Sequence, residues 1–526
     1  MIRLLLFNIV LCLSFQGAAQ TAFYTDFDED MDKYYPKTEK DEAVYGIELL
    51  QPQWVEGISG RALDLSENAA LRKPLVLDSL GVPKYGKIDD LSVQIWVKTL
   101  NGAHQGTPVV GNMLDEDTKG PGWKIFTQPT GAWGVILSDG KKTYTYQPNA
   151  PRQAINDGKW HQIAFSINKE KGEVWFFLDG ENVAIYNTEG LGSLENENRT
   201  VIGGSYEYFE WESSGHWTAF NGYIDEVSIN NVFDNVETIK KNYSRFKSLP
   251  TDEILISPLR VMVWNIWHGG RRLGKHVGVQ RIVETIKESQ ADVIGLIETY
   301  GSGEIIADSL GYHFYLISSN LSIMSRYPIK ETIKAFHSFN FGGAILDVGN
   351  NRELVLLNTW LHYLPDYRSR VTKGETTSDK LVEAEKETRH SEIKSILKEI
   401  QPIISNYNNA PIIMLGDFNC GSHLDWIEET KNIHYNYVVE WPVSLEMEKA
   451  GFNDSFRELN TNPLLSQGLT WTPRAATSSV KYGVCDRIDY IYYKGKLNPI
   501  ESKVIDYHPI MFPSDHAAVI TVFEMD

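Results

Sequence analysis

The sequence predicts an all-β half followed by an α/β half, and two patterns in the order of its segments predict this division. From about residue 22 to 245, short stretches of alternating apolar and polar residues are separated by turn residues. After about residue 258, apolar strands alternate with amphipathic helices. The first pattern is typical of a β-sandwich and the second of layered α/β domains. A chain of 526 residues is long enough for both.

Composition excludes one broad class of protein. Hydrophobic residues make up 42% of the chain and charged residues 23%, which are globular values. The formal net charge is -19, so the chain is not a protein that coats nucleic acid by bulk attraction. A nuclease remains open, because a bound divalent cation can offset local negative charge.

The first twenty residues, MIRLLLFNIVLCLSFQGAAQ, have the pattern of a signal peptide. A basic Arg3 precedes an apolar run that is too short for a membrane anchor, and small residues follow it. We therefore expect residues 1–20 to be removed and the mature protein to be secreted or periplasmic, without a transmembrane segment.

Strand patterns dominate the first half. The segments 91–98 and 160–168 alternate apolar and polar residues, and so does 172–180, in which Asp179-Gly180 is a hairpin signal. Three blocks resemble the laminin-G-like, concanavalin-like family: LSVQIWVKT, DGKWHQIAFSINKEKGEVWFFLDGENV and NGYIDEVSINNVFDNVETIKKNY. The resemblance implies a jelly-roll sandwich over 22–245 that binds glycans or proteins.

The same resemblance implies a calcium ion in some members, which Asp225 and Glu226 could contact. The alternative is that these two acids simply end a strand. A segment with one proline inside it and another directly after it, 246–257, then reads as a linker.

The second half, 258–526, repeatedly ends or begins an apolar strand with an acid, an amide or a histidine. A carboxylate at the edge of an apolar strand costs free energy unless it is paired or binds a metal. Several such positions together indicate one polar cleft at an edge of the sheets. The segments concerned are VMVWN, DVIGLIE, PIIMLGDFN, DRIDYIYY and PSDHAAV.

These segments resemble the endonuclease/exonuclease/phosphatase superfamily, and the resemblance covers nearly all of the second half. The matching blocks, in chain order, are LRVMVWNIW, ADVIGLIET, SIMSRYPI, LVLLNTWLHY, PIIMLGDFN, CDRIDYIYY and PSDHAAV. The resemblance implies a deoxyribonuclease-like four-layer α/β sandwich. It also implies metal-dependent hydrolysis of a phosphoester, in a family that acts on nucleic acids, lipids and inositol phosphates.

The resemblance assigns metal binding to Glu298, with help from Asn265 and Asp515. Oxygen ligands of this kind suit Mg²⁺, with Mn²⁺ or Ca²⁺ as alternatives, rather than zinc.

The resemblance also assigns the catalytic roles. His516 would activate a water molecule for attack on phosphorus, and Asp489 would fix its tautomer. Asp417 would orient the water or a second ion, and Asn419 would donate a hydrogen bond to the phosphate.

One position departs from the family, because Trp360 stands where many members have histidine after Asn-Thr. His362 follows two residues later, and on a continued strand both side chains would share a face. His362 would then reach the phosphate or leaving oxygen, and Trp360 would form a wall for the substrate. The alternative is that His362 is a surface residue at the strand end.

Three further expectations concern the surroundings of the cleft. His268, in a glycine-containing basic loop at 264–274, could contact substrate or be solvated. Arg474, in LTWTPRAA, is a candidate phosphate contact. Cys420 and Cys485 are either a disulfide or two thiols.

Two function classes follow from these patterns. The first is a secreted phosphodiesterase whose sandwich docks to a glycan or surface protein, with an endonuclease acting on DNA or RNA as an alternative. The second is an adhesion protein with a vestigial hydrolase half. The polar residues to which the resemblance assigns metal binding and catalysis are all present, which favours the enzyme over the vestigial hydrolase. The second half lacks a dense run of Lys and Arg, so the substrate could be a lipid, an inositol phosphate or a nucleic acid.

Overall fold

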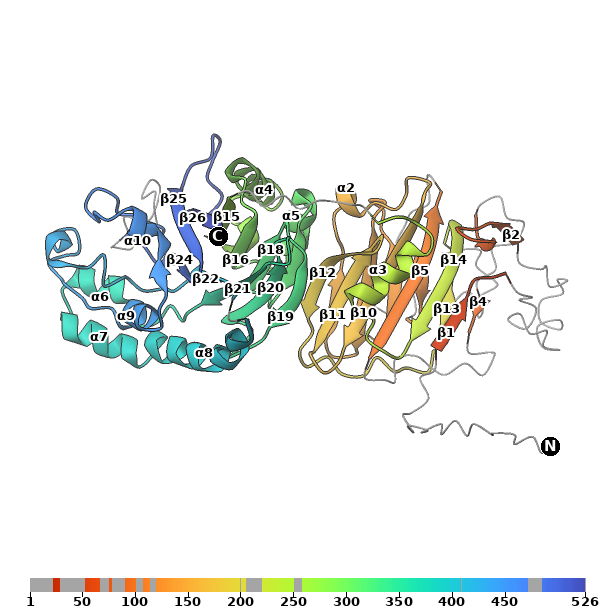
Figure 1. Ribbon diagram of the computed structural model, residues 1–526, viewed down its shortest axis with the longest axis horizontal. Coiled ribbons are helices and arrows are strands. Elements are labelled where there is room, and N and C mark those ends of the chain that lie inside the picture. Colours follow the sequence, from red (N-terminus) through yellow and green to blue (C-terminus); the bar gives the residue numbers. More distant parts are fainter. Residues whose placement is uncertain are drawn as a thin grey trace, which may run out of the picture.

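The chain forms an elongated molecule in which two halves lie side by side (Figure 1). The computed structural model describes residues 22–28, 53–66, 75–77, 90–100, 107–113, 120–198, 200–204, 220–249, 258–407, 409–471 and 485–525. The predicted signal peptide, Arg474 and most of the predicted linker lie outside the described residues. No helix in the described ranges is long and apolar enough to cross a membrane.

The N-terminal half is a sandwich of two antiparallel sheets. One sheet contains β1 (Ala22–Thr25), β2 (Gln53–Glu56), β3 (Arg61–Asp64), β14 (Gly222–Asn230), β5 (Leu91–Thr99), β10 (Trp160–Asn168), β11 (Glu173–Leu178) and β12 (Glu181–Asn187). The other contains β4 (Leu75–Val76), β13 (Val201–Ile202), β6 (Pro108–Gly111), β7 (Pro121–Thr127), β8 (Trp133–Asp139) and β9 (Thr143–Tyr146). Two helices flank them, α2 (Ala150–Gln153) and α3 (Val236–Ser244).

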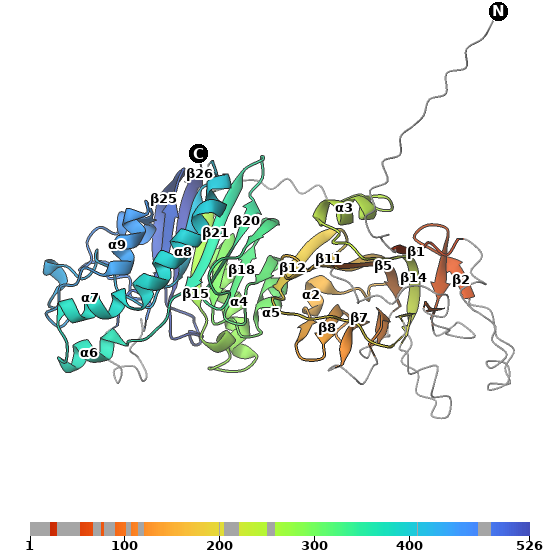
Figure 2. The ribbon, with the colours of Figure 1, turned by 90° about the horizontal axis from the view of Figure 1, so that it is seen from below.

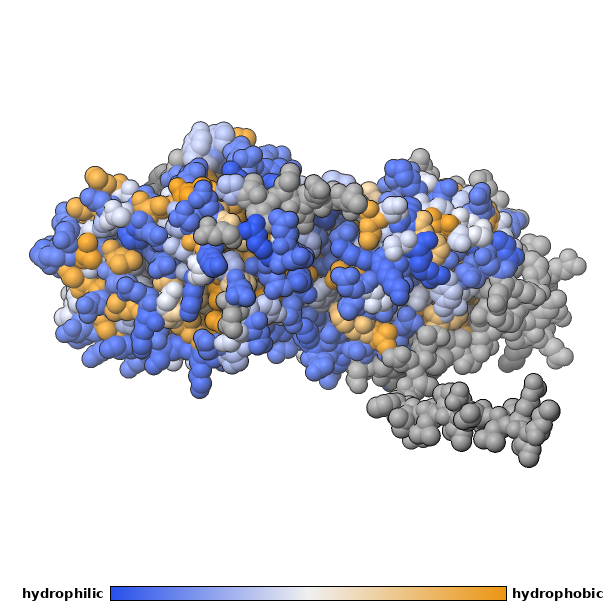
Figure 3. Space-filling view, viewed as in Figure 1, coloured by the Kyte–Doolittle hydropathy of each residue, from blue (hydrophilic) through white to orange (hydrophobic). Residues whose placement is uncertain are grey.

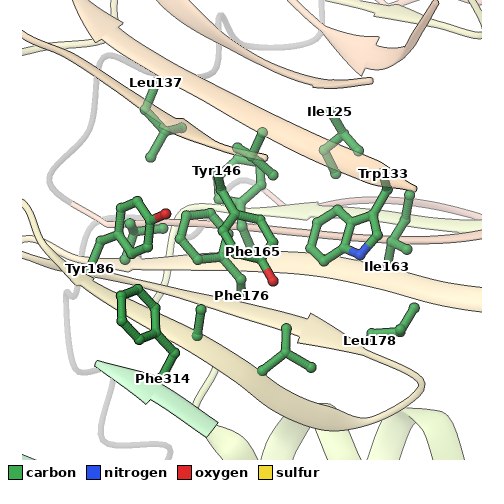
Figure 4. Close-up of a cluster of buried hydrophobic side chains, with 14 of the residues drawn as sticks. Ile125, Trp133, Leu137, Tyr146, Ile163, Phe165, Phe176, Leu178, Tyr186 and Phe314 are labelled. Atoms are coloured by element: carbon green, nitrogen blue, oxygen red, sulfur yellow. The ribbon is translucent and has the colours of Figure 1, made fainter. Parts of the chain in front are cut away.

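The predicted Asp179-Gly180 hairpin joins β11 to β12, and both residues have positive φ, 50° and 81°. A two-residue turn with this geometry fits the twist of paired strands. Between the two sheets, alternate side chains form the core in Figure 4, where Trp133 of β8 and Tyr146 of β9 face Phe165 and Phe176 of the opposite sheet. The Tyr146 and Phe176 rings stack at 4.3 Å.

The C-terminal half contains two further six-stranded layers. The first has β17 (His313–Leu316), β18 (Leu321–Ser325), β16 (Val293–Ile297), β15 (Leu259–Asn265), β26 (Ala518–Met525) and β25 (Leu497–Ile505). The second has β19 (Ile329–Ile333), β20 (Phe341–Asp347), β21 (Glu353–Trp360), β22 (Ile412–Asp417), β24 (Asp489–Lys494) and β23 (Asn453–Asp454).

Helices cover the outer faces of these two layers (Figures 1 and 2). The α-helices are α4 (Val277–Ser289), α5 (Gly303–Leu310), α6 (Tyr367–Lys373), α7 (Ser378–Lys386), α8 (Arg389–Ile404), α9 (Pro442–Lys449) and α10 (Ser455–Leu459). Short 3₁₀ turns are η4 (His268–Gly270), η5 (Ser405–Tyr407) and η6 (Glu428–Thr430). The predicted four-layer α/β sandwich is confirmed.

Clusters of buried hydrophobic side chains fill the spaces between these layers. Ile282 and Ile286 of α4 pack with Ile294 on the outer side of the first layer. Val263 and Leu415 belong to the cluster between the two sheets. At Gly295, an added Cβ would lie 2.0 Å from a methyl carbon of Leu415. The glycine in the DVIGLIE segment therefore lets the two sheets approach closely.

One sheet runs through both halves of the molecule. β12 of the sandwich pairs in parallel with β17, with Ile185 opposite Tyr315, so the described strands of the two halves form a single 14-stranded sheet. The core is shared as well, because Phe314 of β17 packs edge-on against Tyr186 at 6.2 Å (Figure 4). The two halves are therefore joined by backbone hydrogen bonds and apolar contacts in addition to the chain connection. The space-filling view shows polar side chains over most of this face of both halves, with apolar residues scattered among them (Figure 3).

Candidate active site

The predicted polar residues meet where strands of the two facing sheets end. β15 ends at Asn265, which is paired with Ile297, the residue before Glu298. In the opposite sheet, β22 ends at Asp417, directly paired with Asp489. Because the two sheets pack face to face, these four strands bring their polar ends to one edge of the domain.

Asn265 links the two sides of this edge. Its amide nitrogen lies 3.3 Å from Oε1 of Glu298 and 3.2 Å from Oδ2 of Asp417. Its amide oxygen accepts a hydrogen bond from the backbone N–H of Trp267 at 3.0 Å. Asn265 therefore holds two carboxylates in place, and a direct metal-ligand role for its oxygen would require the amide to turn over.

Asp489 and His516 form a buried pair. The Nδ1 atom of His516 lies 2.8 Å from Oδ2 of Asp489, and ligand atoms of these two residues and Asp417 lie within 4.8 Å of one another. All three are almost fully buried, at 1%, 6% and 2% exposure for Asp489, His516 and Asp417. The hydrogen bond directs the second ring nitrogen of His516 away from Asp489.

Three residues that the sequence did not single out for this purpose hold the pair. The buried hydroxyl of Thr470 accepts the backbone N–H of Asp489 at 3.1 Å. The indole N–H of Trp264 donates to the carbonyl of His516 at 2.9 Å. Ser514 donates to the Asn265 carbonyl at 2.7 Å and accepts the N–H of His516 at 3.1 Å. These hydrogen bonds hold the backbones of both Asp489 and His516 in place.

Burial and like charge control the protonation of the cluster. Burial raises the pKa of Asp417, and the Asp489 carboxylate raises it further. Burial alone would lower the pKa of His516, but Asp489, Asp417 and Asp515 outweigh it and raise that pKa to about 10. Without a further cation, His516 would therefore be protonated at neutral pH.

The carboxylates at this edge leave acceptor atoms unused. Oδ1 of Asp489 and Oδ1 of Asp515 are buried and have no hydrogen-bond partner among the described residues. Burial raises the pKa of Asp515, and Glu298 raises it further, which places these two acids near each other. Buried acceptors without partners are costly, and hard oxygen atoms suit Mg²⁺ or Ca²⁺. The residues present fit a divalent cation.

Several residues at this edge have backbone conformations that side chains rarely adopt. Positive φ angles occur at Trp267 (49°), His268 (52°), Glu298 (57°) and Asn419 (53°). Such conformations cost free energy and concentrate at functional sites. The Asn419 N–H donates to Oδ1 of Asp417 at 3.0 Å, and its side-chain amide donates to the Leu361 carbonyl at 2.9 Å.

His362 lies just after the end of β21, and the centre of its ring is 6.2 Å from that of Trp360. β21 ends at Trp360, opposite the last residue of β22, so His362 lies beyond the strand and does not share a strand face with Trp360. Its Nδ1 accepts the N–H of Leu364 at 3.1 Å, and its ring stacks on Tyr363 at 5.1 Å. The structure does not join His362 to the buried cluster.

Aromatic side chains gather at the rim beside Asp417. Trp360 is half-buried and contacts the rings of Phe339 at 5.7 Å and Tyr363 at 6.2 Å. On the other side, the ring of His268 stacks on Tyr300 at 5.5 Å, and its backbone N–H donates to Oε2 of Glu298 at 2.8 Å. His268 is exposed and lies beside the predicted metal ligand.

A cation that the sequence reasoning missed lies near His516. Trp471 forms a β-bridge with His516, and the guanidinium of Arg368 lies 3.7 Å from the centre of the Trp471 ring. Arg368 is buried, and its Nη1 has no hydrogen-bond partner among the described residues. Its place at the start of α6, a hundred residues from Trp471 in the chain, carries no sequence signal for this contact.

The structure also answers two questions that the sequence leaves open. Cys420 is buried and not disulfide-bonded, so it does not form a link to Cys485. In the sandwich, Asp225 accepts the backbone N–H groups of Glu226 at 2.8 Å and Ile58 at 2.9 Å. Its two oxygens are therefore occupied by backbone N–H groups, and Asp225 and Glu226 lie within β14 at a register shift and do not end the strand as the alternative expected.

Comparison with known proteins identifies both halves. Residues 262–516 match the Endonuclease/Exonuclease/phosphatase family, and residues 80–240 match the Concanavalin A-like lectin/glucanases superfamily through its Laminin_G_3 domain. An uncharacterized protein of Caenorhabditis elegans, F14F9.5, is 29% identical over 288 residues, which are 50% of this chain and 90% of that protein.

Solved structures with a similar fold include TDP2 from C. elegans and the human Nocturnin catalytic domain. TDP2 is 18% identical, with 50% of this chain and 74% of that chain covered and a TM-score of 0.36. Nocturnin is 17% identical, with 51% and 94% covered and a TM-score of 0.36. The C-terminal half of this chain belongs to the endonuclease/exonuclease/phosphatase family of phosphoester-hydrolysing enzymes, and it is joined to a concanavalin-like sandwich.

Proposed function

We propose that the protein is a divalent-metal-dependent phosphodiesterase. The observation that carries this proposal is the buried cluster of Asp417, Asp489 and His516, next to which Asn265 contacts both Glu298 and Asp417, while one buried oxygen each of Asp489 and Asp515 has no partner among the described residues. Structural carboxylates in a folded protein are normally hydrogen-bonded. A set that is buried, acidic and unsatisfied suits a cation and a phosphate group.

Glu298 and Asp515 would hold the cation, and Asn265 would hold Glu298 in position. Mg²⁺ is the proposed ion, with Mn²⁺ and Ca²⁺ as alternatives that use the same oxygen ligands. When bound, the ion would neutralise negative charge on the phosphate and on the departing oxygen. Its charge would also offset the carboxylates that raise the pKa of His516, so that the imidazole can be neutral near pH 7.

His516 then acts as the general base. Asp489 accepts a hydrogen bond from the Nδ1–H of His516, which leaves Nε2 unprotonated. Nε2 takes a proton from water as the water oxygen forms its bond to phosphorus. The ester P–O bond on the opposite side breaks, the leaving oxygen takes a proton from solvent, and His516 releases the proton that it took from water to solvent. Asp417 orients the water, and Asn419 donates to a phosphate oxygen.

Two further side chains would contact the substrate. Arg368 presents an Nη1 that has no partner among the described residues beside Trp471, which suits a phosphate oxygen. Trp360, with Phe339 and Tyr363, forms an aromatic wall for the group on the other side of the phosphorus. Arg474 and His362 stay candidate phosphate contacts, and the ring of His362 lies beside that of Trp360.

The sandwich is proposed to dock the enzyme to a glycan or a surface protein. Export of the chain, with removal of residues 1–20, is also proposed. It is tested by sequencing the N-terminus of the protein recovered outside cells that express the full chain. A mature start near Thr21 is expected, whereas an intact Met1 in protein retained inside the cells would contradict export.

The test of the phosphodiesterase proposal is hydrolysis of bis(p-nitrophenyl) phosphate, supercoiled plasmid DNA, sphingomyelin and an inositol phosphate. Activity on at least one substrate should require Mg²⁺, stop with chelator and vanish in His516→Ala. His161→Ala is the matched control, because Nδ1 of His161 also lies 2.8 Å from an aspartate, Asp179, but in the sandwich. Activity that survives His516→Ala, or folded protein that hydrolyses none of the four substrates, would contradict the proposal.

A further inference from the structure

Exposed apolar side chains gather on the loops around the catalytic edge. Ile505 at the end of β25 is paired with Ala518 at the start of β26, so the β25–β26 loop (506–517) lies at the edge where β15 ends. Phe341 at the start of β20 is paired with Thr359 near the end of β21, so the segments before β20 and after β21 lie at this edge as well. Scattered exposed apolar residues are normal, but a group at one edge indicates an interaction surface. The group consists of Phe339, Tyr363, Leu364, Tyr507, Ile510 and Met511.

The β25–β26 loop holds the most exposed of these side chains on an anchored backbone. Ile510 is 75% exposed, and Met511 beside it is 46% exposed. On one side of them, Nε2 of His508 lies 3.1 Å from Oε2 of Glu284 on α4. On the other side, the ring of Phe512 lies 5.3 Å from that of Trp264. In Figure 1 the loop extends past the ends of β25 and β26, next to α4, so its apolar side chains project from the edge.

The segment that follows β15 at the same edge is basic. Residues 266–283 contain four Arg and Lys residues and no Asp or Glu, in a chain whose net charge is -19. Arg272 contacts the ring nitrogen of His268 at 2.9 Å and lies over the Trp267 ring, and Lys275 is exposed. Arg281 is buried, and its Nε and Nη1 have no hydrogen-bond partner among the described residues. This edge therefore combines projecting apolar side chains with a local excess of positive charge.

We propose that this edge docks the protein on the surface of an anionic lipid bilayer. Ile510 and Met511 can enter the bilayer to the depth of one side chain, and the two tyrosines suit the level of the head groups. The cations of 266–283 pair with the lipid phosphates. Nucleic acid would satisfy these cations but would leave the aliphatic side chains in water.

The docking goes beyond the phosphodiesterase activity and does not require it. A bilayer that covers the β25–β26 loop on one side of the site and Phe339, Tyr363 and Leu364 on the other also covers the site between them. Docking would therefore bring the catalytic edge to the lipid head groups.

The test measures co-sedimentation with vesicles in the presence of chelator, so that it does not depend on hydrolysis. The protein begins at Thr21, which retains every described residue and excludes the apolar run of residues 1–20. The vesicles contain phosphatidylcholine alone, or phosphatidylcholine and phosphatidylglycerol in equal amounts. Binding should be stronger to the anionic vesicles and should weaken as the salt concentration rises.

Two pairs of variants separate the apolar from the charged contribution. Ile510→Ser should lower binding about tenfold, because this apolar side chain no longer leaves water on docking. Its matched control is Ile500→Ser, an exposed position nearer the opposite end of β25, which should bind as the parent does.

Arg272→Gln combined with Lys275→Gln should lower binding to the anionic vesicles about fivefold for each cation removed. Its matched control is Lys394→Gln combined with Lys398→Gln, the same change of charge at two exposed positions of α8, which should bind as the parent does. Circular dichroism of each variant checks the fold.

The proposal is overturned if the parent binds neither kind of vesicle, or if Ile510→Ser and Ile500→Ser bind equally. It is also overturned if the two double variants lose binding equally. Supercoiled plasmid DNA that binds the parent, in place of the vesicles, and is lost in the Arg272/Lys275 variant would assign the surface to nucleic acid instead.

Discussion

Acidic side chains lie on or next to strands in both halves of the molecule, but their acceptor atoms are used differently. In the sandwich, Asp225 accepts backbone N–H groups and Glu226 accepts the Tyr24 hydroxyl at 2.5 Å. In the C-terminal half, Asp489 and Asp515 each keep a buried oxygen without a partner among the described residues. A carboxylate on or next to an apolar strand therefore indicates a metal or catalytic site only when the surrounding groups leave its oxygens unoccupied.

The largest expected effect distinguishes two histidine–aspartate pairs of equal length. Asp489→Asn should lower kcat/KM about 10²- to 10⁴-fold, because the amide no longer fixes the His516 tautomer or stabilises its protonated form. Asp179→Asn, which alters the pair of His161 in the sandwich, should leave kcat/KM within about twofold of the wild-type value. Similar losses in both variants would show that the effect is not specific to the site.

A second comparison concerns carboxylates that are buried and fully paired. Asp425 accepts the Nε–H groups of Arg457 at 2.8 Å and Arg487 at 2.9 Å, and Arg487 also pairs with Asp454. Removing one member leaves buried guanidinium charge, so Asp425→Ala should lower the free energy of unfolding by about 3–5 kcal/mol in urea denaturation. Lys171→Ala, which removes a half-exposed pair with Glu331, should cost less than about 1 kcal/mol. Equal losses of unfolding free energy in Asp425→Ala and Lys171→Ala would contradict this account of the buried ion pairs.

A buried acid outside the site provides a pH test. Burial raises the pKa of Glu385 from 4.5 to about 7, although Arg389 and the Val443 N–H oppose the shift. Below pH 4.5 the carboxyl is protonated in both the folded and unfolded chain. Between the unfolded and folded pKa values only the unfolded chain loses the proton, so stability falls as pH rises to about 7.

The expected loss is on the order of 3 kcal/mol across that window, and Glu385→Gln should remove most of it. Glu383→Gln, an exposed substitution on the same helix, should retain the wild-type dependence. Melting temperatures from about pH 4 to pH 8 measure the difference. A parallel pH dependence in Glu385→Gln and the wild type would contradict the assignment.

The smallest expected effect concerns the rim. Trp360→Ala should raise KM several-fold with little change in kcat, because in the proposed function the ring forms a wall for the substrate and takes no part in proton transfer. If the wall contacts an aromatic or acyl group, the rise in KM should be larger for bis(p-nitrophenyl) phosphate and sphingomyelin than for an inositol phosphate. An equal fall in kcat and kcat/KM would instead place Trp360 in the transition-state machinery.

The strand motifs predicted most of the site residues, because a polar residue at the end of an apolar strand can be recognised in the sequence. Glu298, Asp417, Asp489 and His516 were found in this way. The positive φ of Glu298 and the bridge made by Asn265 depend on partners more than about 30 residues away, and no local pattern specifies them. The end of β21 at Trp360, before His362, is likewise set by its pairing with β22.

Long-range packing accounts for the other differences. The apolar spacing within 384–404 predicts one helix. In the structure the helix is interrupted at Thr388, whose φ and ψ are -124° and -103°, so α7 and α8 are separate. The parallel pairing of β12 with β17 joins segments that are far apart in the chain, so alternation within either strand could not predict it. The sequence pattern divides the chain into halves, whereas tertiary contacts join them into one sheet.

Binding of Mn²⁺, followed by electron paramagnetic resonance, tests the central claim most directly. The full chain should bind Mn²⁺, and Asp515→Asn should weaken that binding at least about tenfold, because an unoccupied ligand oxygen is lost. Glu226→Gln in the sandwich should bind as the wild type does, since its partner is Tyr24. Equal binding by all three proteins, or loss in Glu226→Gln alone, would contradict the claim that the C-terminal cluster holds the metal.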